Sequence, residues 1–157
     1  MKSLLATLLL TIVLCAGYTA SRGQAGDSHG GQIEGTWRVQ VTQRNCQTGA
    51  EIRKFPAMLT FGVGGTLTGT STVVPPSARS GDHGIWEFNG NGRYAATSEA
   101  FLFSGGAWVQ TQRITQAITL SQDADTFYSE AHTEFFDTAG NLVLSGCATA
   151  VATRMTF

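Results

Sequence analysis

Residues 33–44 read IEGTWRVQVTQR and contain the clearest strand pattern in the chain. Apolar Trp37, Val39 and Val41 alternate with polar residues along this stretch. Alternation with a period of two predicts a β-strand that has one buried face and one solvated face. Gly35 lets another segment pass close to the backbone, and the large Trp ring can fill the end of a core. We therefore expect this strand to begin the chain's folded domain.

The composition indicates a single domain built from strands and tight turns. Its 157 residues suit one domain, only 13% of them are charged, and 19 are Gly. The formal net charge is −1, and no run of Lys or Arg occurs. Since phosphate contacts need clustered basic residues, a nucleic-acid partner is excluded.

Seven further segments have the features of strands, and Gly-, Asn- or Pro-rich links separate them. Residues 89–92, Asn-Gly-Asn-Gly, are the strongest hairpin signal, while Pro75-Pro76 ends a strand before the one long loop, Ser77–His83. The eight predicted strands are residues 33–44, 54–61, 66–74, 84–88, 93–103, 108–120, 126–136 and 142–157.

Short links between eight strands predict an antiparallel meander, because neighbours along the chain then pair side by side. A meander of this size can close into an up-and-down barrel, which removes the unpaired sheet edges. A β-sandwich is the alternative, but its crossover could come only from residues 75–83. We predict the barrel, an all-β fold without helices.

The chain begins with the pattern of an export signal. Lys2 precedes the apolar run Leu4–Ala16, which is too short for a membrane span. Small residues favour cleavage after Ala25, with cleavage after Ala20 as the alternative. We thus predict a signal peptide at 1–25, a flexible leader at 26–32 and one barrel domain at 33–157.

The predicted location is secreted or periplasmic, with a lipid anchor on Cys15 as a minor alternative. No transmembrane span is predicted, and the sequence indicates no oligomeric state. Removal of the signal leaves two cysteines, Cys46 and Cys147. In an exported protein, such a pair predicts a disulfide, the alternative being two buried free thiols.

The Gly-x-Trp at residues 35–37, together with the eight-strand meander, resembles the calycins, the lipocalin and avidin group of small β-barrels. Residues 65–70, Gly-Thr-Leu-Thr-Gly-Thr, are similar to a strand of avidin-like proteins. In calycins an Arg of the last strand commonly packs on the first-strand Trp, and here that strand carries Arg154. The resemblance implies binding of small hydrophobic molecules. Biotin is disfavoured, because avidins have Asn where this chain has Val39.

The resemblance also bears on the disulfide. If Trp37 lies opposite Arg154 in antiparallel strands, Cys46 and Cys147 fall within one diagonal step of the same register. A bridge between them would tie the first strand to the last.

Small residues on three predicted strands indicate a lumen with free space, bounded by aromatic side chains. Such a cavity suits an apolar or aromatic molecule, whereas a fully packed core is the alternative. Gln110 and Gln112 are placed inside because the opposite choice would bury Arg113. The lumen candidates are Gly69, Ser71, Trp86, Tyr94, Ala96, Ser98, Trp108, Gln110, Gln112 and Ala150.

No catalytic motif is present, and no catalytic residue, metal site or cofactor is predicted. The acidic and His positions 130, 132 and 134 share one strand face, and a solvated outer face explains them best. Asp82-His83 is interpreted as a polar loop tip. We therefore predict a secreted barrel that binds a small apolar or aromatic molecule. The alternatives are a barrel-type isomerase or cyclase, and an interaction or inhibitor module with a filled core.

Overall fold

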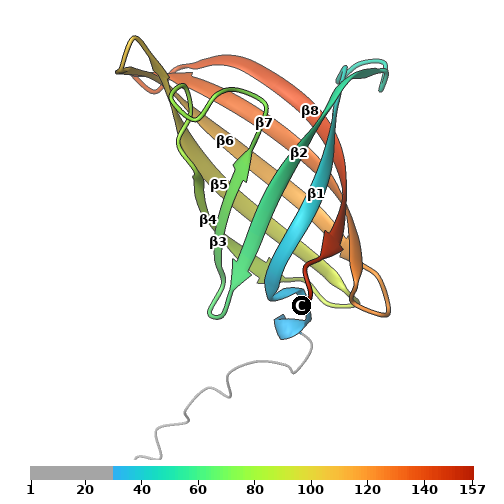
Figure 1. The fold of residues 1–157 in the computed structure, drawn as a ribbon. Helices are drawn as coiled ribbons and strands as arrows, with labels where there is room; N and C mark the ends of the chain where they lie inside the picture. Colours follow the sequence, from blue (N-terminus) through green and yellow to red (C-terminus); the bar gives the residue numbers. More distant parts are fainter. Residues whose placement is uncertain (1–29) are drawn as a thin grey trace, which may run out of the picture.

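Eight antiparallel strands form one closed barrel in chain order in the computed structural model, which describes residues 30–157 (Figure 1). The predicted all-β, up-and-down barrel is confirmed. The predicted signal peptide, Cys15 and leader residues 26–29 lie outside the described residues. The strands are β1 (Gly35–Arg44), β2 (Glu51–Gly62), β3 (Thr66–Ser71), β4 (Asp82–Phe88), β5 (Arg93–Ser104), β6 (Ala107–Leu120), β7 (Thr126–Asp137) and β8 (Leu142–Arg154).

The barrel wall is shortest at β3 and β4. β3 ends at Ser71 rather than at the expected Val74, since the chain turns away before Pro75-Pro76, which lack N–H donors for a ladder. β4 begins at Asp82, two residues earlier than expected, because Asp82 pairs with Gly69. The loop between these strands therefore has to complete the wall on this side.

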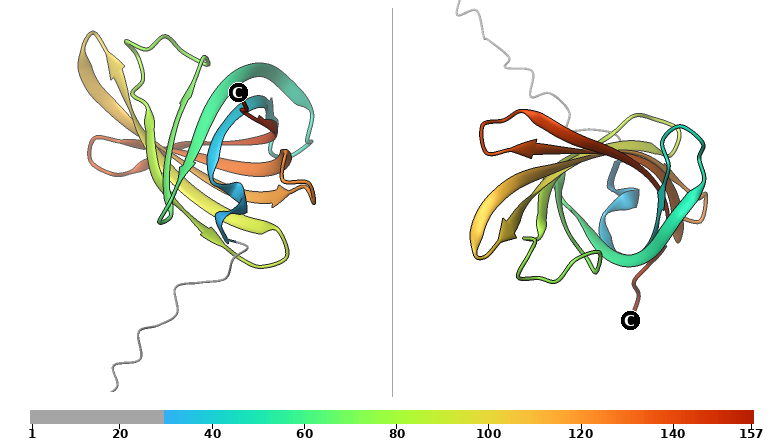
Figure 2. Two further views of the ribbon diagram at one scale, coloured as in Figure 1. Left: turned by 60° about the horizontal axis from the view of Figure 1, so that its bottom comes forward. Right: turned by 90° about the horizontal axis from the view of Figure 1, so that it is seen from above.

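Two ends of the barrel differ, as Figure 2 shows by looking at the molecule from below and from above. A 3-10 turn, η1 (Gly30–Ile33), crosses the lower end beside the C-terminus. Residues 30–32, expected to belong to a flexible leader, are part of this turn. Ile33 and Trp37 are fully buried there, and the Trp37 indole donates to the Ile33 carbonyl at 2.9 Å. Within residues 30–157, no helix is long and apolar enough to cross a membrane.

Large side chains fill this closed end. The Trp37 ring lies 4.9 Å from that of Phe127, and Phe61 meets Phe127 edge-on at 6.0 Å. The Trp86 ring lies against Phe61 and Tyr94, and its indole donates to the Gly62 carbonyl at 3.0 Å. Aromatic pairs of this geometry stabilise a core beyond the area that they bury. The closed end is thus a packed core rather than an open pore.

Arg154, the last residue of β8, stabilises the closed end through several contacts. It lies opposite Trp37 in the β1–β8 ladder, with its guanidinium carbon 4.3 Å from the ring centroid. The guanidinium donates to the carbonyls of Ala124 at 2.7 Å, of Glu34 at 2.6 Å, and of Gln32. One side chain therefore joins η1, the β6–β7 turn and the first strand.

Gly35→Ala is expected to destabilise this junction. Gly35 has a φ of 121°, and a methyl group there would lie 3.0 Å from Nη1 of Arg154. Strained backbone of this kind costs roughly 1–3 kcal/mol, so the thermal midpoint should fall by several degrees. Gly146→Ala is the control, since its φ is ordinary and nothing lies within 4 Å of the added methyl. Equal melting temperatures for the two variants would contradict the expectation.

A disulfide joins Cys46 and Cys147, as predicted, with their Cα atoms 5.2 Å apart. Cys46 lies just beyond β1, whose last residue, Arg44, is the ladder partner of Cys147. The bridge therefore connects the β1–β2 turn to β8 at the upper end, opposite the Arg154 junction. The first and last strands are tied at both ends.

Candidate ligand-binding cavity

A cavity of about 200 Å³ lies inside the barrel, above the packed closed end. Engineered protein cavities of roughly 150 Å³ accept benzene, so this one has room for a single ring with a small substituent. Most of its wall is apolar. The apolar lining residues are Val39, Val41, Phe55, Ala57, Leu59, Val73, Val74, Leu102, Ile114, Ala131, Phe135, Ala148 and Ala150.

The cavity exists because side-chain size changes along the barrel axis. At the closed end, inward positions carry large residues such as Trp37, Phe61 and Tyr94. Further up the barrel, several inward positions on β2, β3, β5, β7 and β8 carry small ones. These are Ala57, Ser71, Ser98, Ser129, Ala131, Ala148 and Ala150, all of which line the cavity. Of the small residues predicted to face the lumen, Ser71, Ser98 and Ala150 therefore border free space.

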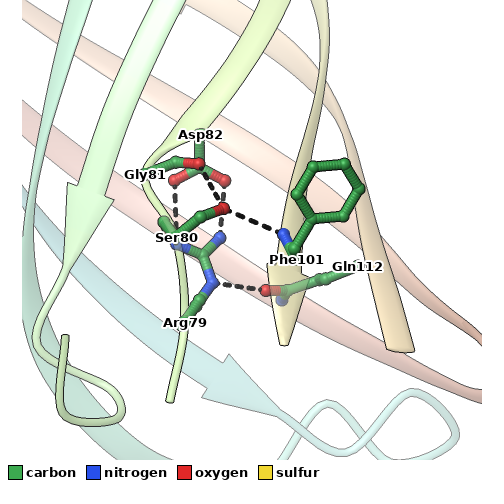
Figure 3. Close-up of polar contacts among 6 residues, drawn as sticks. All are labelled: Arg79, Ser80, Gly81, Asp82, Phe101 and Gln112. Atoms are coloured by element: carbon green, nitrogen blue, oxygen red, sulfur yellow. Dashed lines mark hydrogen bonds and ion pairs between the residues drawn. The ribbon is translucent and has the colours of Figure 1, made fainter. Parts of the chain in front are cut away.

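A buried ion pair projects into this cavity from the β3–β4 side (Figure 3). The Arg79 guanidinium meets the Asp82 carboxylate through two bonds, Nη2 to Oδ1 at 2.5 Å and Nη1 to Oδ2 at 3.1 Å. Arg79 Nε donates to the Gln112 Oε1 at 2.7 Å. The Arg79 and Asp82 side chains are only 5% and 6% exposed. Pairing and hydrogen bonds of this kind are what a buried charge requires.

The loop delivers Arg79 to the lumen by pairing with β5. Arg79 forms an isolated bridge with Leu102, and the Ser80 amide donates to the Phe101 carbonyl at 2.9 Å. The Phe101 amide in turn donates to the Ser80 hydroxyl at 2.9 Å, as drawn in Figure 3. Because directly paired residues share a face, Arg79 points inward with Leu102. Residues 78–82 thus continue the wall where β3 and β4 are short.

The interpretation of Asp82-His83 as a polar loop tip is wrong, because both residues belong to β4. Asp82 begins β4 and is buried, whereas His83 lies on the exposed outer face, opposite Thr68. Strand alternation separates the two neighbours. Adjacent polar letters in a sequence therefore do not mean a shared environment.

Polar groups also lie on the deeper wall of the cavity. Ser98, Gln116 and Ser129 all line it and are buried, and the Ser129 hydroxyl lies 3.5 Å from Gln116 Oε1. Among the described residues, no fully buried side-chain nitrogen or oxygen lacks a partner. Alternation could have predicted Gln116 and Ser129, since they share faces with Ile118 and Phe127. Arg79 had no such signal, because it lies in a loop.

Four of the ten lumen candidates line the cavity: Ser71, Ser98, Gln112 and Ala150. Gly69, Tyr94 and Ala96 face inward but do not line the cavity. Tyr94 and Ala96 belong to the packed core, and a methyl group on Gly69 would collide with Leu59 Cδ2. Burial raises the pKa of the Tyr94 phenol, and a hydrogen bond with the Ile33 backbone opposes that shift.

The other three candidates lie apart from the cavity. Trp86 packs in the closed end, as described above. Gln110 pairs with Leu102 on the inward face but lies above the cavity wall.

The prediction that Trp108 faces the lumen is wrong, because this residue lies on the outer face of the barrel. Its side chain is 45% exposed, and its ring contacts that of Phe101 at 6.0 Å. The reason is a bulge in β6. Leu102 pairs with Gln110 while Phe103 pairs with Trp108, so Val109 has no partner and the alternation reverses. A count of every second residue cannot detect this shift.

A second hollow of about 940 Å³ is a groove on the outside of the wall, formed by β8, β1, β2 and residues 70–76. It is more open than the inner cavity and would leave much of a ligand's surface in water. Because small-molecule sites bury most of the ligand, the inner cavity is the stronger candidate. Within residues 30–157, no cluster of His, Cys, Asp or Glu is arranged to hold a metal ion.

Comparison with protein-family models and with curated proteins finds no match for this chain. The assignment of a function therefore depends on the geometry and chemistry of the cavity itself.

Proposed function

We propose that this protein is a calycin-like barrel of the lipocalin or avidin type that binds a small apolar or aromatic molecule in its lumen. The observation that carries the proposal is the 200 Å³ cavity with its largely apolar wall. An apolar ligand gains free energy by leaving water for such a wall, and the few polar groups set its orientation. Binding without catalysis requires no other functional group.

We place this activity outside the cytoplasm. The Cys46–Cys147 disulfide supports the assignment, since such bonds persist in oxidising compartments. The export signal at residues 1–25 remains a prediction, as does the choice between a secreted and a periplasmic protein. Purification from the native host followed by mass spectrometry under native conditions would detect a co-purified ligand.

The two alternatives fit the cavity less well. An interaction module with a filled core is disfavoured by the free volume. An isomerase or cyclase would need an acid or base that is free to approach its substrate. Both Asp82 oxygens accept hydrogen bonds from Arg79, which favours a role in positioning over one in proton transfer.

Ala150→Phe is expected to abolish binding while the barrel stays folded. Ala150 lines the cavity beside Val41 and Ser129, its ladder partners, so a phenyl group there would occupy the free volume. With toluene as the probe, the thermal midpoint of the wild type should rise with ligand concentration, because binding to the folded state stabilises it. The midpoint of the variant should not respond.

Ala117→Phe is the matched control, since Ala117 is exposed on the outer face of β6. It should respond to toluene as the wild type does. Overpacking a filled core costs typically 1–3 kcal/mol, so a strongly destabilised Ala150→Phe beside an unaffected Ala117→Phe would contradict the proposal. Calorimetric titration is the direct measurement. Indole fluorescence is unsuitable, because none of Trp37, Trp86 and Trp108 lines the cavity.

A further inference from the structure

The charged cluster in the cavity carries no net charge. Arg79 and Asp82 oppose each other at hydrogen-bond distance, and both are almost fully buried. A carboxylate ligand would approach the Arg79 cation and the Asp82 anion together, while losing its own hydration. Burying a charge without a dedicated partner is costly. The cluster therefore discriminates against charged ligands of either sign.

The hydrogen-bonding capacity left in the cluster is mixed. A guanidinium has five N–H donors, and four bonds engage Arg79 with Gln112, Ser80 and Asp82. Each Asp82 oxygen accepts one of these bonds, although a carboxylate has about four acceptor sites. The Gln112 oxygen is used by Arg79, and within residues 30–157 its amide nitrogen donates to no protein group. Acceptor capacity on Asp82 thus lies beside donor capacity on Gln112 and Arg79.

A hydroxyl group matches this arrangement, because it donates one hydrogen bond and accepts others. It can donate to Asp82 while accepting from Gln112 or Arg79. A carbonyl can only accept, and a hydrocarbon leaves the cluster's remaining groups unpaired. We propose that the ligand is a neutral alcohol or phenol, about one ring in size, whose hydroxyl binds at Arg79, Asp82 and Gln112. This inference rests on the proposed lumen binding.

The cavity walls support the same ligand shape. Phe55, Ile114, Ala131 and Phe135 contribute apolar surface to the same cavity as the cluster. A ring can lie against these side chains while its hydroxyl reaches the charged pair. Small-molecule sites usually combine a largely apolar wall with a few polar groups that fix the ligand's orientation.

Three probes that share a methyl-substituted ring test the inference by calorimetric titration at pH 7 and about 0.15 M salt, which screens exposed charges. They are toluene, p-cresol and p-toluate. We expect p-cresol to bind about tenfold more tightly than toluene. A hydrogen bond to a charged group contributes at least roughly the free energy that a tenfold difference in affinity requires. We expect p-toluate to bind at least tenfold more weakly than p-cresol.

Variants identify the cluster as the source of this preference. In Arg79→Met/Asp82→Leu, apolar residues replace the pair, an exchange that buried ion pairs often tolerate. Toluene binding should persist, and the preference for p-cresol should disappear. Asp82→Asn leaves the Arg79 charge unopposed, so the affinity for p-toluate should rise relative to that for p-cresol. Arg113→Gln is the control for an exposed cation outside the cavity, and it should leave the ranking unchanged.

The outcomes separate the two proposals. Equal binding of toluene and p-cresol to the wild type, or preferred binding of p-toluate, would overturn the hydroxyl inference and leave lumen binding standing. A p-cresol preference that survives in the double variant would overturn it too. If none of the three probes binds the wild type, the proposed function fails, and this inference fails with it. Titration of the three probes into the wild type tests the hydroxyl inference even if a variant does not fold.

Discussion

Cys46→Ser/Cys147→Ser is expected to lower the free energy of unfolding by about 4–5 kcal/mol. The bridge spans 101 positions, and closing a loop of this length removes much conformational entropy from the unfolded chain. Domains are commonly stable by only about 5–15 kcal/mol, so the loss is a large fraction of the total. Chemical denaturation followed by far-ultraviolet circular dichroism measures it from the shift in midpoint.

Reduction of the wild type supplies the control for this prediction. A reducing agent should move the wild-type midpoint to that of the double variant, whereas the variant should not respond to the agent. A double variant as stable as the oxidised wild type would show that the unfolded chain gains little freedom from losing the bridge. Two thiols that alkylate in the exported protein would contradict the bridge itself.

Arg154→Ala is expected to cost about 3 kcal/mol, the second-largest effect. The substitution removes the cation–π contact with Trp37, which contributes roughly 1–2 kcal/mol when partly desolvated. It also leaves the carbonyls of Gln32, Glu34 and Ala124 without their charged donor. Hydrogen bonds to charged groups contribute roughly 1.5–3 kcal/mol, although water can replace part of this. Thermal unfolding should show a decrease of roughly ten degrees.

Two further substitutions test whether the geometry of Arg154 matters. Arg154→Lys keeps the charge but loses the planar fork of donors, so its stability should lie between those of Arg154→Ala and the wild type. Arg113→Ala removes an exposed Arg that pairs with Glu99 at 2.8 Å, a contact expected to contribute less than about 1 kcal/mol. If Arg154→Ala is no more destabilising than Arg113→Ala, the proposed junction does not hold the closed end.

The two junctions have different roles in the barrel. Arg154 joins segments at the closed end, where the core is packed, whereas the disulfide joins the first and last strands at the upper end beside the cavity. An end that contains free volume loses packing contacts, because a void offers no partner atoms to its lining. The covalent link is therefore placed where packing contributes least.

The strand number, strand order and barrel closure could be predicted from the sequence alone. Alternation with a period of two is a local property, so it predicts the inward face of any strand that has no bulge without knowledge of its neighbours. The small inward residues of β5 and β8, such as Ser98 and Ala150, were found in this way. The disulfide could be predicted because two cysteines remain after the signal is removed, and because the Trp37–Arg154 pairing implies a register that brings them together.

Which inward residues meet free space depends on how the strands pack together. Tyr94 and Ala96 share a strand face with Ser98, yet they belong to the packed end because large residues from other strands surround them. Trp108 lies outside because a bulge reverses the alternation, and the position of a bulge depends on the partner strand. Arg79 reaches the lumen because its loop pairs with β5. Free volume, register and loop pairing all depend on several segments at once, so no local pattern in one segment specifies them.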